Sequence, residues 1–260
     1  MIAIRNKARE RLEAGEVAAG CGLRMARTVD IAKAMKTCGF DWLFIDLEHG
    51  TMPLDIAAQI SVAALDAGIA PLVRVPHMRH DLATRVLDGG ALGIVMPHVD
   101  TAEQAAEVVD HLKYPPTGHR SAAGPLAHFD FTRPPAADAI AALNEATLIV
   151  VMLETPKAIE NADAIAAVAG VDVLLIGTND LTTEMGIPGG LGDDRVVAAY
   201  ETMIEACRKH GKWAGMGGAY TDELLRKYIG MGVRMVLSGN DFTLMMEAAT
   251  ARAALVRSCQ

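Results

Sequence analysis

The sequence predicts a single (β/α)8 TIM barrel that spans residues 1–260. Eight strand-like apolar runs alternate with helical stretches, which is the pattern of a parallel sheet with crossover helices. The length of 260 residues matches one α/β barrel domain of about 250 residues. A doubly wound open sheet is the alternative, but it usually has fewer strands, and no GxGxxG motif follows the first run.

Each expected strand is a run of aliphatic and β-branched residues closed by a polar residue, a proline or a glycine. The runs end near Leu23, His49, Pro76, His98, Glu154, Asp180, Gly218 and Asn240. Two glycine-rich segments, Met216–Gly218 and Pro188–Gly192, are interpreted as turns and not as phosphate-binding loops.

The helices between the runs carry start and stop signals. Thr155 and Pro156 place an N-cap before a first-turn proline, which predicts a helix that continues to Val168. A second helix is expected to end at His210, because Gly211 can close it.

Two segments depart from this regular pattern. The segment 114–125, rich in proline and glycine, cannot be regular, and we expect a loop over the barrel mouth or into a partner subunit. The last helix, Phe242 to Arg257, is strongly apolar and needs a large surface, which another subunit can supply.

The composition narrows the class of partner. A net charge of −8, without basic runs, argues against nucleic acid or an anionic membrane as the main partner. No apolar stretch approaches the roughly 20 residues of a membrane span, and the N-terminus becomes charged too early for a signal peptide. The four cysteines show no CxxC pair, which predicts reduced thiols in a cytoplasmic protein.

Two carboxylates stand at matching positions, one strand-helix repeat apart. Glu154 and Asp180 each close an apolar run, so they are expected on neighbouring strands, roughly 5 Å apart. Carboxylates that close repel each other unless a cation lies between them, and Mg²⁺ or Mn²⁺ suits oxygen ligands. Zinc is disfavoured because these strand ends carry no His or Cys. The alternative is that each residue caps the following helix.

Other polar residues at the expected strand ends are catalytic candidates: Asp46, Glu48, His49, Arg74, His98, Thr178 and Asn179. His49 is either a general base or a hydrogen-bonded scaffold residue. Arg74 lies within an apolar run, where a charge is costly unless paired. It either binds a carboxylate or enolate oxygen, or it forms a salt bridge to an acid on the next strand. Asp46 and His49 would point to opposite faces of a regular strand.

Six motifs occur in order and resemble the HpcH/HpaI aldolases, which are class II, metal-dependent pyruvate aldolases: Ile45–Gly50, Val73–Pro76, Gly93–Pro97, Tyr114–Ser121, Met152–Thr155 and Ile176–Leu181. The resemblance runs from about Leu12 to Leu255. It implies a modified barrel whose final helix is exchanged between neighbouring subunits, assembled as a hexamer built from dimers.

The resemblance also implies residue roles. Glu154 and Asp180 would bind Mg²⁺, Mn²⁺ or Co²⁺, His49 would be the base, and Arg74 would stabilise developing enolate charge. The backbone amides of Asn179 and Asp180 would meet the pyruvate carboxylate.

Two further positions are read from the family pattern. Asp88, which spacing alone does not select, matches the acidic partner of the histidine. Several members carry a substrate-contacting glutamine where this chain has Met152. A thioether cannot donate a hydrogen bond, so one substrate contact is absent or replaced.

The resemblance, together with these residues, implies an aldolase that reversibly cleaves a 4-hydroxy-2-oxo acid to pyruvate and an aldehyde. His49, directly or through water, would remove the C4 hydroxyl proton, and Arg74 with the metal would hold the enolate charge. No lysine ends an apolar run, which disfavours a Schiff-base aldolase. The alternatives are an acyl-CoA lyase with the same site, which needs a basic groove, and a non-catalytic barrel that binds an oxo acid.

Overall fold

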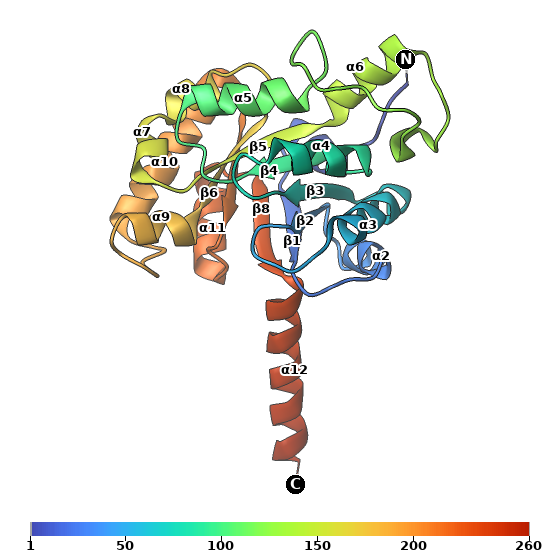
Figure 1. Ribbon diagram of the computed structural model, residues 1–260. Coiled ribbons are helices and arrows are strands. Elements are labelled where there is room, and N and C mark those ends of the chain that lie inside the picture. The colour runs from blue at the N-terminus through green and yellow to red at the C-terminus, as the bar shows by residue number, and fades with distance from the viewer. Residues whose placement is uncertain (1, 260) are drawn as a thin grey trace.

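The computed structural model describes residues 2–259 and shows a closed barrel of eight parallel strands (Figure 1). Each strand pairs with the next in sequence, and β8 pairs with β1 to close the barrel. The predicted fold class is therefore confirmed. The strands are β1 Ala18–Leu23, β2 Trp42–Asp46, β3 Ala70–Arg74, β4 Gly93–Met96, β5 Leu148–Leu153, β6 Val173–Gly177, β7 Trp213–Gly217 and β8 Met235–Asn240.

Helices follow the strands and form an outer layer around most of the barrel (Figure 1). They are α1 Lys7–Glu13, α2 Asp30–Thr37, α3 Leu54–Ala67, α4 His80–Asp88, α5 Ala102–Leu112, α6 Ala136–Ala146, α7 Pro156–Glu160, α8 Ala162–Ala166, α9 Thr178–Glu184, α10 Asp194–His210, α11 Asp222–Met231 and α12 Asp241–Ser258, with a short 3₁₀ helix at Ala127–Phe129.

The barrel interior is a packed core that is closed at the end where the strands start. Large side chains such as Trp42, Phe44 and Leu175 form one buried cluster, to which Ala8 and Leu12 of α1 also belong. Because α1 precedes β1, it closes the end of the barrel where the strands start. The opposite end, where the strands finish, is free to hold a site.

The predicted helix signals agree with the structure except at one point. Thr155 caps α7 by accepting a hydrogen bond from the Ala158 amide, and Gly211 ends α10 with a φ of 64°. The single helix expected up to Val168 is wrong, because the chain breaks at Asn161 into α7 and α8. The side-chain amide of Asn161 donates a hydrogen bond from Nδ2 to the backbone carbonyl of Asp100, which ties the break to the loop before α5.

The irregular segment after α5 lies at the end of the barrel where the strands start, so the expectation of a loop over the mouth is wrong. Helix α5 has already returned the chain to the end where strands start. From there Arg120 donates to Asp88 at 2.6 Å and stacks on Tyr114 at 4.6 Å, while His128 contacts the carbonyl of Ala91. Helix α6 then leads into β5.

Helix α12 projects away from the barrel (Figure 1). None of its residues is buried, although Phe242, Leu244, Met245, Met246, Leu255 and Val256 are large and apolar. An apolar helix with no surface to cover in its own subunit agrees with the sequence analysis. No helix within residues 2–259 is long and apolar enough to cross a membrane.

Candidate active site

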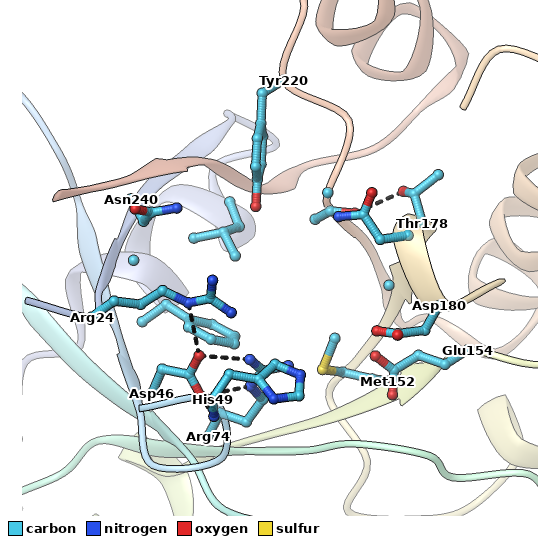
Figure 2. Close-up of a pocket in the computed structure, with 17 residues that line it drawn as sticks. Arg24, Asp46, His49, Arg74, Met152, Glu154, Thr178, Asp180, Tyr220 and Asn240 are labelled. Atoms are coloured by element: carbon cyan, nitrogen blue, oxygen red, sulfur yellow. Dashed lines mark hydrogen bonds and ion pairs between the residues drawn. The ribbon is translucent and has the colours of Figure 1, made fainter. Parts of the chain in front are cut away.

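A cavity of about 410 Å³ lies at the end of the barrel where the strands finish (Figure 2). Six of the seven predicted site residues line it: His49, Arg74, Met152, Glu154, Asn179 and Asp180. They come from the ends of four strands, and the two that are farthest apart in sequence, His49 and Asp180, are separated by 131 positions. The fold itself therefore brings these residues together. Met152 points into the barrel from β5 and is almost fully buried.

Glu154 and Asp180 lie next to each other on one side of this cavity (Figure 2). Glu154 follows β5 directly and is only 1% exposed. Asp180 lies in the first turn of α9, because β6 ends three residues earlier, at Gly177. Neither carboxylate caps a helix: Thr155 caps α7, and α9 has no side-chain cap. Side-chain capping is therefore wrong for both, although Asp180 has the position of an acid in the first turn of α9.

The surroundings of Glu154 favour a cation. Burial raises the pKa of Glu154, and repulsion from Asp180 raises it further, although a hydrogen bond from the His98 amide at 2.8 Å opposes this. Two adjacent carboxylates, one of them buried, offer only oxygen donors. This donor set fits a hard divalent cation such as Mg²⁺ or Mn²⁺.

Arg74 faces the carboxylates and is fixed by two acids. Its Nε and Nη2 donate to Asp46 at 3.0 and 2.6 Å, and Nη1 lies 3.1 Å from Glu48. Burial alone would lower the pKa of Arg74, but the hydrogen bonds to Asp46 and the negative charges of Asp46, Glu48 and Glu154 together raise that pKa. A guanidinium has five N–H groups, so two remain for a ligand. Arg74 can therefore form salt bridges to Asp46 and Glu48 and still bind a ligand oxygen with its remaining N–H groups.

Asp46 also shapes the loop that carries His49. Strand β2 ends at Asp46, whose Oδ1 accepts the backbone amides of Glu48 and His49 at 3.0 and 3.2 Å. This bend places the His49 side chain at the cavity, half exposed. Its Nε2 lies 4.0 Å from Glu48.

Comparisons with known proteins agree on one family. The sequence profile of the HpcH/HpaI aldolase/citrate lyase family matches residues 25–248. The chain is 39% identical to the 4-hydroxy-4-methyl-2-oxoglutarate aldolase tasA of Hapsidospora irregularis, covering 100% of this chain and 98% of the relative. It is 34% identical to the 2-keto-3-deoxy-L-rhamnonate aldolase of Escherichia coli K12, over 97% and 94% of the two chains. This chain belongs to the HpcH/HpaI aldolase/citrate lyase family.

A solved structure supports the same assignment. The HpcH/HpaI aldolase from Desulfitobacterium hafniense DCB-2 superposes with a TM-score of 0.89 at 29% identity, covering 96% of this chain and 95% of that one. The protein is therefore a carbon-carbon lyase of the aldolase type.

One predicted residue of this HpcH/HpaI enzyme lies outside the cavity. Asp88 is the last residue of α4, which runs from the end of β3 back toward the start of β4. A nine-residue helix is about 13 Å long, so Asp88 lies toward the opposite end of the barrel from His49. It pairs with Arg120 at 2.6 Å and lines a different cavity with Phe131. Within one subunit Asp88 and His49 are not brought together.

Three residues of the cavity were not identified from the sequence, and one strand-end candidate, His98, has a contact that was not predicted. The amide of His98 and its ring Nδ1, at 3.3 Å, both approach Glu154. Arg24, Tyr220 and Asn240 form the other wall of the cavity (Figure 2). The strand-end rule could have found Arg24 and Asn240, because Arg24 directly follows β1 and Asn240 ends β8. Tyr220 lies three residues beyond β7, where no pattern marks it.

A second group of metal-binding residue types lies away from this cavity. His80, Glu107 and His111, on α4 and α5, have donor atoms within 4.8 Å of one another. None of them lines the cavity that holds Glu154. Imidazole ligands suit metals such as Zn²⁺. Metal-binding measurements on this protein therefore need a variant that removes this second group.

Proposed function

We propose that this enzyme is a class II pyruvate aldolase that cleaves a 4-hydroxy-2-oxo acid to pyruvate and a second carbonyl compound, using a divalent cation held by Glu154 and Asp180. The observation that carries the proposal is the buried Glu154 beside Asp180, in a cavity that Arg74 enters from the other side. The names of both relatives denote cleavage of 4-hydroxy-2-oxo acids. Mg²⁺, Mn²⁺ and Co²⁺ are the candidate cations.

Different residues of the chain have separate roles in the retro-aldol step. When bound, the cation would supply Lewis-acid polarisation of the 2-oxo group. The first-turn amides of α9, at Asn179 and Asp180, have no intrahelical acceptor and are available for the substrate carboxylate. Arg74 holds two N–H groups ready for the oxygen on which charge develops as the C3–C4 bond breaks. Met152 forms an apolar floor that keeps water away from the reacting carbons.

His49 is proposed as the base that removes the C4 hydroxyl proton. It lines the cavity and is exposed enough to exchange protons with solvent. The electron pair of the C3–C4 bond passes to C3, and C4 becomes the carbonyl carbon of the released product. Protonation at C3 then gives pyruvate.

The orienting acid for His49 is proposed to be Asp88 of the partner subunit. Asp88 is too far along α4 to reach His49 in its own subunit, but its side chain remains about one third exposed. A neighbouring subunit would therefore complete the site. We further propose a homohexamer, a trimer of dimers, in which α12 is exchanged between neighbours, because α12 buries nothing in its own subunit.

A cytoplasmic location is proposed from the thiols. All four cysteines are free, and Cys38 and Cys259 are exposed. Exposed free thiols persist in a reducing compartment.

The test is pyruvate release after metal removal. The enzyme is stripped with EDTA, Mg²⁺, Mn²⁺ or Co²⁺ is added back, and pyruvate is followed with 4-hydroxy-4-methyl-2-oxoglutarate and with 2-oxo-3-deoxy-L-rhamnonate. Metal-dependent release, lost in Glu154→Gln and Asp180→Asn and kept in His111→Ala, supports the proposal. If neither substrate yields pyruvate although Mn²⁺ binding still needs Glu154, the aldolase chemistry is rejected.

A further inference from the structure

The wall of the cavity opposite Glu154 and Asp180 carries three side chains that can donate hydrogen bonds. Arg24, Tyr220 and Asn240 come from the segments after β1, after β7 and at the end of β8. These three strands are neighbours in the barrel, and Asn240 is the register partner of Gly22, two residues before Arg24. Figure 2 shows Arg24 and Asn240 on the left of the open space and Tyr220 above it.

Arg24 is fixed by its backbone while part of its guanidinium stays free. The carboxylate of Asp241 accepts the amides of Arg24, Met25 and Ala26 at 3.0, 3.0 and 2.6 Å. The side chain makes one long bond, from Nε to Asp46 at 3.3 Å, and is 44% exposed. Within residues 2–259 neither Nη atom of Arg24 has a hydrogen-bond partner in the protein. The four N–H groups on the Nη atoms of Arg24, which lines the cavity, are therefore available to a ligand.

Asn240 presents its amide nitrogen to the same space. Its Oδ1 caps α12 by accepting the Thr243 amide at 3.1 Å, which fixes the orientation of the side-chain amide. The Nδ2 group is left without a protein partner among the described residues, and in Figure 2 it points toward Arg24 and the cavity.

Tyr220 adds a hydroxyl from above the cavity (Figure 2). Burial raises the pKa of this hydroxyl, so it stays protonated and can donate at neutral pH. A guanidinium, an amide NH₂ and a phenol O–H thus offer donors to the same space, and only the Nε of Arg24 is engaged, by Asp46 at 3.3 Å. Such a set recognises an anion with several lone pairs, and a planar carboxylate matches the fork of arginine.

We propose that Arg24, Tyr220 and Asn240 bind a carboxylate on the acceptor half of the substrate. The inference rests on the proposed function, which places the 2-oxo acid half at Glu154 and Asp180 on the opposite wall. The substrate class is then a 4-hydroxy-2-oxo acid with a second carboxylate on C4, formed from pyruvate and another 2-oxo acid. Substrates whose acceptor half is an uncharged polyol lack the carboxylate that these three donors would bind, so they gain less binding energy here.

The reaction of this substrate class balances without any co-reactant. In 4-hydroxy-4-methyl-2-oxoglutarate the C4 hydroxyl loses its proton, the C3–C4 bond breaks, and C4 becomes the carbonyl carbon of one pyruvate. C3 keeps the electron pair, takes one proton and becomes the methyl group of the second pyruvate. The wall at Arg24 holds the carboxylate that leaves with C4.

The test compares kcat/KM for this diacid and for the monoacid 2-oxo-3-deoxy-L-rhamnonate, whose acceptor half carries no charge, with Mn²⁺ present. Charge-assisted hydrogen bonds of about 1.5–3 kcal/mol predict that Arg24→Met lowers kcat/KM for the diacid about 10- to 100-fold and leaves kcat/KM for the monoacid within about threefold. Tyr220→Phe is expected to show the same selectivity with a smaller loss. Arg27→Met, in the same loop but outside this cavity, is the matched control for loss of charge.

Two outcomes separate the ways in which the inference can fail. Exchange of pyruvate methyl protons with D₂O needs the proposed metal and base but no acceptor. If the wild-type enzyme shows no exchange, the proposed function itself fails. If exchange is normal and Arg24→Met affects both substrates equally, or neither, Arg24 only supports Asp46 and the acceptor carboxylate site is rejected.

Discussion

Glu154 is positioned by contributions from three neighbouring strands. It follows β5, accepts the amide of His98 after β4, and fills the space beside Gly177 at the end of β6. A Cβ atom at Gly177 would lie 2.4 Å from Glu154 Oε1 and 2.7 Å from its Cγ. The glycine is therefore required by the carboxylate and not by the backbone conformation.

We predict that Gly177→Ala displaces Glu154 and weakens Mn²⁺ binding about 10- to 100-fold, as losses of supporting contacts around metal ligands do. Titration calorimetry measures the affinity. Gly217→Ala is the matched control, because Gly217 is the register partner of Gly177 and its Cβ would meet its nearest neighbour at 3.4 Å. Equal Mn²⁺ affinity in wild type and Gly177→Ala would show that Glu154 is not held as described.

The residues that sequence could predict are those at strand ends. Glu154, Asp180, His49 and Arg74 each interrupt or close an apolar run, and the barrel rule brings such positions to one end. The pairing of Asp46 with Arg74 could not be read, because it depends on their register across β2 and β3. The hydrogen-bond donors of Arg24, Tyr220 and Asn240 meet at the cavity because of side-chain rotamers and the cap made by Asn240, which sequence spacing does not determine.

The order of strands and helices was predictable, whereas the break at Asn161 and the place of the segment after α5 were not. Hydrophobic periodicity reports which residues face the core, but not at which end of a barrel a loop packs. Lys113, the residue after α5, holds that segment at the end of the barrel where the strands start. Its Nζ donates to the carbonyls of Asn144 and Thr147 at 2.6 and 2.5 Å, which joins the end of α5 to the end of α6 and the start of β5.

Burial of Lys113 has a testable effect on stability. Desolvation lowers the pKa of Lys113 to about 8, below the ordinary value of about 10.4. Between these values the unfolded chain binds more protons at this site than the folded chain, so stability rises with pH. We predict that the free energy of unfolding of the wild type, relative to Lys113→Met, rises by up to about 3 kcal/mol between pH 7 and pH 10.5.

Urea denaturation of both proteins across this pH range measures the difference. Other groups titrate in the same window, but they are shared by the two proteins and cancel in the comparison. Parallel curves for wild type and Lys113→Met would mean that the lysine keeps its ordinary pKa in the folded chain.

At the scale of the whole molecule, the barrel accounts for every element except α12. Six large apolar side chains on an isolated helix form a surface that a lone subunit would rarely expose. The apolar pattern of this helix was visible in the sequence, but the surface that receives it was not, because that surface belongs to an assembly.

We predict that the full chain is an oligomer and that Leu255→Glu, which places a charge on an exposed apolar position of α12, shifts it to smaller species. Light scattering after size-exclusion chromatography measures the mass. Arg252→Glu, on the same exposed helix, is the control and is expected to keep the assembly. A monomeric wild-type protein at micromolar concentration would contradict helix exchange.

The central claim is that Glu154 and Asp180 hold a divalent cation that activates the 2-oxo acid. Exchange of the pyruvate methyl protons in D₂O, followed by proton NMR, tests it most directly because no acceptor substrate is needed. We predict exchange that stops with EDTA, returns with Mg²⁺, Mn²⁺ or Co²⁺, and falls at least about 100-fold in Glu154→Gln and Asp180→Asn. Exchange that survives EDTA, or that Glu154→Gln supports at the wild-type rate, would contradict the account.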